Sequence, residues 1–206
     1  PRRLTGSQLT PVQIAEQERL HNIVLENLAV LIADGMPLEY LIGLDEFGAH
    51  LFPQGAWKWE RKGAQHVESL VKRDKRQYTG DLVINAAGEI IILEQIFMGK
   101  TKACLPSKEI RDQFPQFQFN YSHNHWANHH TKVALMKRIY SWVITHYSHV
   151  NQCSEKEAQA QKPTCAVLLD CWPVNLTEIF RDEVKEHCPG MILFFIAAGA
   201  TGLYQV

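Results

Sequence analysis

The chain has 206 residues, of which 46% are hydrophobic, and its formal net charge is -1 with a pI near 6.9. This length and hydrophobic content suffice for one core, so we predict an arm or linker over residues 1–9 and a single domain over residues 10–206. The near-neutral charge argues against strong non-specific DNA binding by this stretch alone. No apolar run approaches the ~20 residues of a membrane helix, so no membrane partner is expected.

Five cysteines, an odd number without any C-x-x-C spacing, predict reduced thiols in an intracellular protein, most of them in the core.

The first predicted element is a helix between Thr10 and Asp34. Thr10 offers an N-cap, Pro11 suits the first helical position, and Gln13 completes a capping box. Asp34 and the glycine after it form a helix C-terminal signal. A strand follows at residues 40–46, where an apolar run ends at Asp45.

Residues 57–63 mix aromatic and basic side chains. Trp57, Lys58, Arg61 and Lys62 form the kind of set that stacks on bases and touches phosphates. The alternative is a hairpin loop whose tryptophans cover the edge of the core.

Residues 77–85 and 89–97 are rich in strand-forming residues and flank a short Gly-containing turn. They predict a hairpin, which makes the first three strands an antiparallel meander. Asp81 and Glu94, inside these strands, are expected on an exposed face of the sheet.

Residues 99–130 are predicted to form a long loop. It begins with Lys100, a further candidate for nucleic-acid contact together with His125, and it holds four histidines within eight residues: His123, His125, His129 and His130. Zinc is one interpretation, but a zinc site needs four properly spaced ligands and no C-x-x-C partner exists. A polar loop that caps the next helix is the favoured interpretation, with Asn128 or Thr131 at the start of that helix.

The last part of the chain alternates helices and strands. Residues 151–163 are predicted as a surface loop, and a second apolar strand then ends at Asp170. We expect Asn175 to cap the following helix, with Glu178 at its third position. A buried strand over residues 191–196 completes the set.

This order of elements predicts an α/β, ribonuclease-H-like fold, a mixed five-stranded sheet with helices on both faces. If the strands that end at Asp45 and Asp170 are parallel neighbours, both carboxylates project from the same edge, where open α/β sheets bind ligands.

An ordered set of motifs from about residue 10 onward resembles the pogo/Tigger-like branch of the DDE-superfamily transposases. The motifs are Leu44-Asp45-Glu46-Phe47, Leu51-Phe52-Pro53, Lys62-Gly63, Lys75-Arg76-Gln77, Gly99-Lys100-Thr101, Asn124-His125-Trp126 with Asn128, and Leu168-Leu169-Asp170. The resemblance implies a catalytic domain in which three acids hold two Mg²⁺ or Mn²⁺ ions for DNA strand cleavage and transfer. Asp45 matches the first acid and Asp170 the second.

Two departures from the family lie at the catalytic edge. In the segment that carries the third acid, Thr201 is matched, and Gln205 is the one further candidate for a match. After Asp170 the family has a Gly- or His-containing turn, where Trp172 and Pro173 would crowd a metal pocket.

We therefore expect a transposase-derived, catalytically degenerate DDE domain of a nuclear, DNA- or chromatin-associated host protein, which binds DNA mainly through segments outside this stretch. One alternative is an active Mg²⁺-dependent DDE endonuclease or transposase whose third acid lies beyond Val206. A protein-interaction scaffold is the other.

Overall fold

The computed structural model describes residues 10–50 and 77–196. Four of the predicted nucleic-acid contacts lie outside these residues, as do the two matches to the third-acid segment: Trp57, Lys58, Arg61, Lys62, Thr201 and Gln205. The chain divides into two compact units: unit 1 comprises residues 1–45, 82–92 and 128–206, and unit 2 comprises residues 46–81 and 93–127. The boundaries of the single domain that the sequence predicts stay a prediction.

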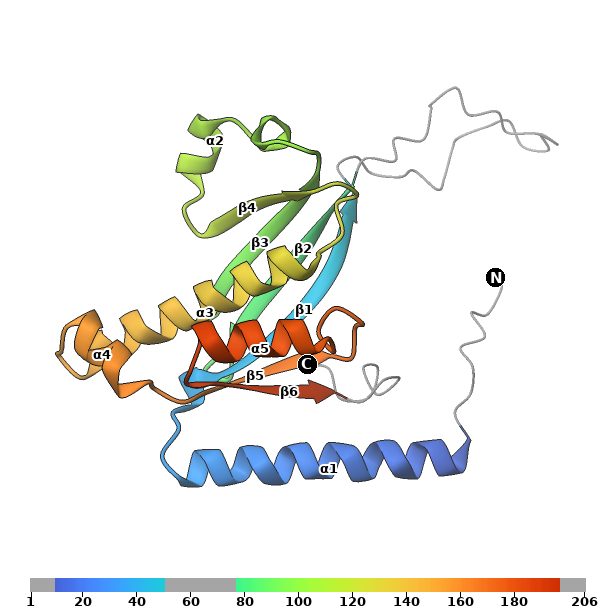
Figure 1. Cartoon of the computed structure of the whole chain (residues 1–206), viewed down its shortest axis with the longest axis vertical. Coiled ribbons are helices and arrows are strands. Elements are labelled where there is room, and N and C mark those ends of the chain that lie inside the picture. Colours follow the sequence, from blue (N-terminus) through green and yellow to red (C-terminus); the bar gives the residue numbers. More distant parts are fainter. Residues whose placement is uncertain (1–9, 51–76, 197–206) are drawn as a thin grey trace, which may run out of the picture. The chain divides into compact units, whose positions relative to one another are not determined.

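The strands form one mixed sheet in the order β4-β3-β2-β1-β5-β6 (Figure 1). Their bounds are β1 Leu41–His50, β2 Gln77–Asn85, β3 Ile90–Met98, β4 Phe117–Ser122, β5 Cys165–Asp170 and β6 Met191–Ile196. The α/β, ribonuclease-H-like class is confirmed, but the predicted count of five strands is wrong.

The sixth strand, β4, lies within the segment that was predicted to be a loop. Its aromatic residues Phe117, Phe119 and Tyr121 alternate with polar ones, which is the signal of a half-buried strand. It pairs in parallel with β3, from Leu93 opposite Phe117 to Met98 opposite Ser122.

The α-helices are α1 Pro11–Ala33, α2 Lys108–Gln113, α3 His129–Val150, α4 Glu155–Gln161 and α5 Glu178–His187, with 3-10 turns η1 Leu38–Tyr40 and η2 Lys102–Cys104. The capping box of Thr10 with Gln13 is confirmed at α1. At α3, Asn128 is the N-cap and Thr131 completes a capping box.

Two predictions about helices in the last third of the chain are wrong. The expected surface loop over residues 151–163 contains α4, which Ser154 and Glu157 start through a capping box. The N-cap of α5 is Thr177, whose hydroxyl accepts a hydrogen bond from the Phe180 amide, and not Asn175. The side chain of Asn175 instead donates hydrogen bonds to Asp170.

Unit 1 has a continuous apolar core. It joins the middle of β1 and β5 to α3 and α5, and Ile42, Val167, Leu135 and Phe180 are fully buried within it. Helix α3 contacts both α4 and α5 (Figure 1). The two adjacent strands β1 and β5 therefore run through the core and emerge from it at both ends.

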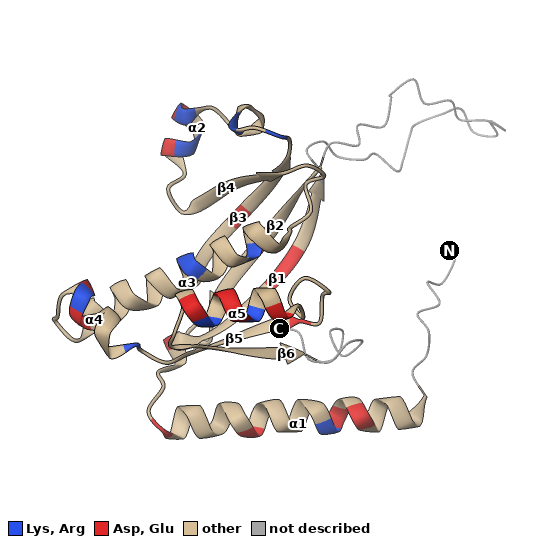
Figure 2. Ribbon diagram, in the orientation of Figure 1, with Lys and Arg blue, Asp and Glu red and all other residues tan. Residues whose placement is uncertain are grey.

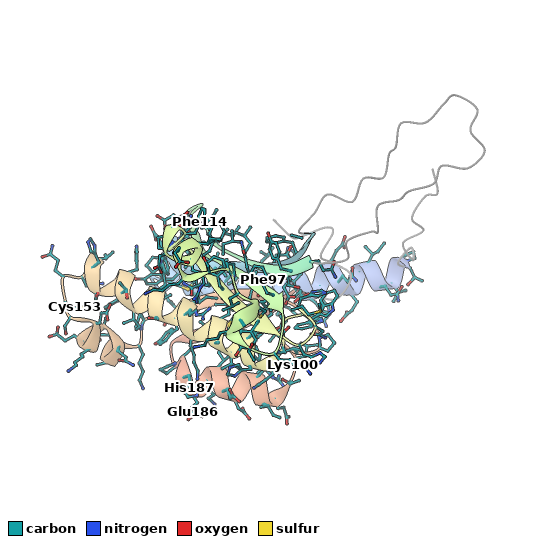
Figure 3. The ribbon with its side chains drawn as sticks, turned by 90° about the horizontal axis from the view of Figure 1, so that it is seen from above. Phe97, Lys100, Phe114, Cys153, Glu186 and His187 are labelled. Atoms are coloured by element: carbon teal, nitrogen blue, oxygen red, sulfur yellow. The ribbon has the colours of Figure 1, made fainter. Side chains whose placement is uncertain are left out.

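Unit 2 is built around β3 and β4 and carries more of its aromatic surface at half exposure. Tyr78 stacks on Phe97 with ring centroids 5.5 Å apart, and Phe114 meets Phe117 edge to face (Figure 3). Gly80 lies under the ring of Phe47, so closely that a Cβ atom would overlap it. A glycine at this strand position therefore serves packing against an aromatic ring.

Candidate active site

Asp45 and Asp170 lie on two neighbouring parallel strands in unit 1: Asp170 is the last residue of β5, whereas Asp45 is the fifth of the ten residues of β1, which continues to His50. Strand β1 pairs with β5 in a register that sets Leu41 opposite Ala166 and Gly43 opposite Leu168. The pairing ends at Gly43 and Leu168; if the same register were continued by two residues, Asp45 would lie opposite Asp170. Neighbouring strands are about 4.8 Å apart, and side chains at paired positions share a face of the sheet. The parallel pairing that the sequence predicted is confirmed, whereas the catalytic role of the two acids stays a prediction.

Both acids stand where their strands leave the core. Leu44 and Leu169, the residues immediately before them, are 8% and 1% exposed. Asp45 itself is exposed and Asp170 is half-buried. Carboxylates that come close to each other repel, so partners in the protein, solvent or a cation must compensate for their charge. Neither acid is without an interaction partner in the protein.

Asn175 anchors Asp170 from the turn after β5. Its side-chain amide nitrogen donates to Oδ1 of Asp170 at 3.0 Å and to the main-chain oxygen of Asp170 at 3.3 Å. Asn175 is only 1% exposed, and its own Oδ1 is buried without a hydrogen-bond partner. The sequence assigned this residue to helix capping and missed its contact with the acid. The available signal was an amide side chain five residues after the candidate acid, within a tight turn.

The turn between Asp170 and Asn175 is also tied to the edge strand. The thiol of Cys171 donates to the main-chain oxygen of Ile196 at the end of β6, with 2.9 Å between sulfur and oxygen. Trp172 is half-buried and Pro173 exposed in this turn. The two residues that the sequence identified as obstacles thus belong to a turn that is fixed at both ends.

Other acids of the strands are not at this edge. Asp81 and Glu94 in unit 2 are fully buried, so the prediction that they face solvent is wrong. On β2, Thr79, Asp81, Val83 and Asn85 are all buried, which shows that the face carrying polar residues is the covered one. Neither acid is without an interaction partner.

The histidine-rich segment does not converge on one point. His125 in unit 2 approaches the Gln77 amide nitrogen through Nε2 at 2.8 Å and the Thr79 hydroxyl through Nδ1 at 3.4 Å. His129 in unit 1 contacts Glu183 at 3.0 Å, and this hydrogen bond lowers the pKa of the Glu183 carboxyl. Within residues 10–50 and 77–196, no group of three or more His, Cys, Asp or Glu side chains gathers in a way that could hold a metal ion.

The five cysteines all belong to the described residues and are free thiols. Cys165 and Cys188 are buried, whereas the other three are half-buried, so fewer lie in the core than the sequence predicted.

Two predicted nucleic-acid contacts are described, and both belong to unit 2. Lys100 is exposed in the turn after β3 (Figure 3), and His125 is half-buried. Further basic residues follow Lys100 in the same unit and on α2 (Figure 2). Their contact with nucleic acid stays a prediction. Among the described helices, none is both long and apolar enough to cross a membrane.

The mixed six-stranded sheet and its helices form a ribonuclease-H-like fold, the fold of the Mos1 mariner transposase. The chain is similar to a chain in the crystal structure of the Mos1 mariner paired end complex with Mn, with a TM-score of 0.52 and 13% sequence identity over 94% of this chain and 45% of that chain. It is also similar to a chain in a pre-cleavage Mos1 transpososome, with a TM-score of 0.55 and 12% identity over 98% of this chain and 48% of that chain. The chain thus spans about half the length of these transposase chains. No family model and no curated protein matches it.

Proposed function

We propose that the chain is the DDE-type domain of a transposase of the pogo/Tigger-like branch, in which Asp45 and Asp170 hold divalent metal ions for cleavage and joining of DNA strands. The register of β1 with β5 carries this proposal, because it brings the two carboxylates to one edge of the sheet. Likeness of fold to Mos1 chains, one of them in a paired end complex with Mn, supports it.

The donor set fits Mg²⁺ or Mn²⁺. Carboxylate oxygens are hard ligands of the kind that both ions prefer, and such sites retain several waters, so an exposed edge suits them. When bound, a pair of ions activates the attacking oxygen and stabilises the leaving oxygen of a phosphodiester. In this chain Asp45 and Asp170 hold the ions, and Asn175 fixes the orientation of the Asp170 carboxylate.

A calorimetric titration with Mn²⁺ tests the metal site. We expect saturable binding to the unchanged chain, loss of binding in Asp45→Asn, and unchanged binding in Asp112→Asn, which neutralises an exposed acid on α2. Failure of the folded, unchanged chain to bind Mn²⁺ would remove the basis of the proposal. Equal binding by Asp45→Asn would place the ion elsewhere.

The second candidate is a domesticated, catalytically degenerate domain that acts in a DNA- or chromatin-associated nuclear protein. The turn that carries Trp172 and Pro173 favours it, because a bulky side chain two residues after Asp170 restricts the access of DNA to the acid. In this case DNA is recognised by segments outside the described residues.

The second candidate predicts that Asp45→Asn leaves nuclear localisation and chromatin association in cells unchanged, because neither depends on metal. Loss of chromatin association in this variant, with its amount and folding unchanged, would count against it. A DNA-binding measurement across salt concentrations separates both candidates from a protein-interaction scaffold, since binding through phosphates weakens steeply with salt.

A further inference from the structure

Unit 1 contains a cavity of about 560 Å³ at the end of the sheet opposite to the two acids. The cavity lies where α1 ends and the chain turns into β1 (Figure 1), and the last turns of α3 and the approach to β5 complete its wall. Tyr40 and Thr164, which immediately precede the two strands, line it. Asp45 follows Tyr40 by five residues, roughly 16 Å along the strand. The cavity and the acid pair are therefore separate features.

The electrostatic environment of this cavity is negative. The C-cap residues of both long helices, Asp34 of α1 and Asn151 of α3, line it. Each helix C-terminus carries a partial charge of about -0.5 from the aligned peptide dipoles. The carboxylates of Asp34 and Glu39 add to this charge, and no lysine or arginine belongs to the lining.

The inner wall is aromatic and held in place. The hydroxyl of Tyr40 lies 3.2 Å from Nδ1 of His146, and the two rings meet edge to face. On its other side, the His146 ring stacks on Trp142 with centroids 5.1 Å apart. Tyr40 is 3% exposed, and burial is the main reason why its pKa rises to about 12, so it remains an uncharged phenol. Tyr147, Leu31 and Met36 extend this apolar surface.

A lining that combines two carboxylates with aromatic and apolar side chains matches one kind of side chain. Arginine and lysine have an apolar stem that packs against such walls and a cationic head that remains near acids and solvent. The planar guanidinium of arginine also stacks on tyrosine rings. The volume falls within the range of small-ligand sites and leaves room for the peptide backbone on either side of the arginine.

We propose that this cavity binds an arginine side chain that a partner polypeptide presents. The site does not depend on metal, on DNA or on the chemistry of Asp45 and Asp170. Its partner is a basic segment of a protein. The cavity recognises this segment at the end of unit 1 that is remote from the acid pair.

The probe is the peptide acetyl-Gly-Arg-Gly-amide, and its control contains citrulline, which has nearly the same shape as arginine and no charge. Amide chemical shifts of the ¹⁵N-labelled chain report where each peptide binds. We expect the arginine peptide to shift residues 34–40 and 146–151, and to bind about tenfold more tightly than the citrulline peptide, a difference of about 1.4 kcal/mol. Its affinity falls as salt is added, because the two carboxylates lie close to solvent.

The double substitution Asp34→Asn with Glu39→Gln removes both carboxylates of the lining, and asparagine is well suited to a helix C-terminus. We expect this variant to bind both peptides with equal affinity. Glu26→Gln, which neutralises an exposed acid on α1 that does not line the cavity, retains the preference for arginine.

Three results would overturn the proposal: equal affinity of the unchanged chain for both peptides, shifts confined to other residues, or no saturation at millimolar concentration. The comparison of the two peptides needs no variant, so it decides the matter even if the double variant does not fold.

Discussion

The two ends of the β1–β5 pair differ in the state of their polar groups. At the amino ends, Tyr40 is buried, neutral and engaged with His146. Beyond the core, five and six residues after Tyr40 and Thr164, Asp45 is exposed and Asp170 half-buried. The same fully buried apolar residues, such as Ile42 and Val167, separate both ends. One pair of strands can thus present unlike polar groups on the two sides of the core, because each side is shaped by the helices and turns that meet it.

The largest expected effect is a loss of stability when the core between the two ends is disrupted. Phe180 of α5 is fully buried in the core of unit 1, and Phe180→Ala should lower the free energy of unfolding by about 3–5 kcal/mol. Urea denaturation measures this change. Ile179→Ala, at the neighbouring residue that is 66% exposed, should change stability by less than about 0.5 kcal/mol. Similar values for the two variants would mean that α5 does not pack as described.

Two tyrosines near the amino ends allow a matched comparison. The hydroxyl of Tyr140 accepts a hydrogen bond from the Gly190 amide at 3.1 Å. Gly190 itself is so close to the Pro163 carbonyl that no side chain fits there, so the amide cannot move away. Tyr140→Phe should therefore cost about 1–3 kcal/mol, the range for an amide left without a partner.

Tyr40→Phe should cost less, about 0.5–1.5 kcal/mol, because the partner that loses its hydrogen bond, His146, is only half-buried and so is not fully desolvated. Thermal or urea unfolding of both variants gives the order. Neither should alter the affinity for Mn²⁺, because both tyrosines lie at the end of the strands that lacks the acid pair. An equal loss of Mn²⁺ binding in both would show that the ends are not independent.

At the carboxyl end, Asn175→Ala should weaken Mn²⁺ binding about tenfold or more, because groups that orient a metal ligand contribute 10- to 100-fold to affinity. Its hydrogen bond to Oδ1 of Asp170 is the reason for this expectation. Calorimetry at one pH measures the change. Asn27→Ala, which removes an exposed asparagine bonded to a main-chain oxygen of α1, is the control. Unchanged affinity in Asn175→Ala would limit Asn175 to a structural role in the turn.

The parallel pairing of β1 with β5 could be predicted because each strand contains a short apolar run followed by an acid. The end of β1 could not, since the strand continues past Asp45 to His50. The helix start at Thr10 could also be predicted, and that of α3 could be narrowed to Asn128 or Thr131, because helix caps are local signals. The residues that specify these elements are close together in the sequence.

Features that depend on distant residues were missed or misassigned. The alternation of aromatic and polar residues in β4 lies in a segment rich in histidines and prolines, which favours a loop. Pairing with β3 makes this segment a strand. Asp81 and Glu94 were assigned to solvent because a charged side chain in a strand usually faces water. The sequence predicts Asn175 as a helix cap, because it does not show whether the Asn175 side chain binds the start of the helix or Asp170. In each case a tertiary partner decides between two locally reasonable conformations.

The smallest expected effect again contrasts the two ends of one strand, because Cys165 begins β5 and Asp170 ends it. Burial, aided by the charge of Cys188, raises the pKa of the Cys165 thiol from 9.0 to about 12. Between these values the unfolded chain loses this proton and the folded chain keeps it. The contribution of this thiol to the free energy of unfolding is therefore fully present below pH 9 and declines as the pH rises toward 12.

From pH 8 to pH 10 this thiol should account for about 1.4 kcal/mol of lost stability. Urea denaturation at the two pH values should show a drop that is smaller by this amount in Cys165→Ala than in the unchanged chain. Cys104→Ala, at a half-buried cysteine of unit 2, should leave the drop as it is. If Cys165→Ala lost as much stability as the unchanged chain, alkaline destabilisation would have to come from other groups with raised pKa values, such as Cys188 and Tyr40.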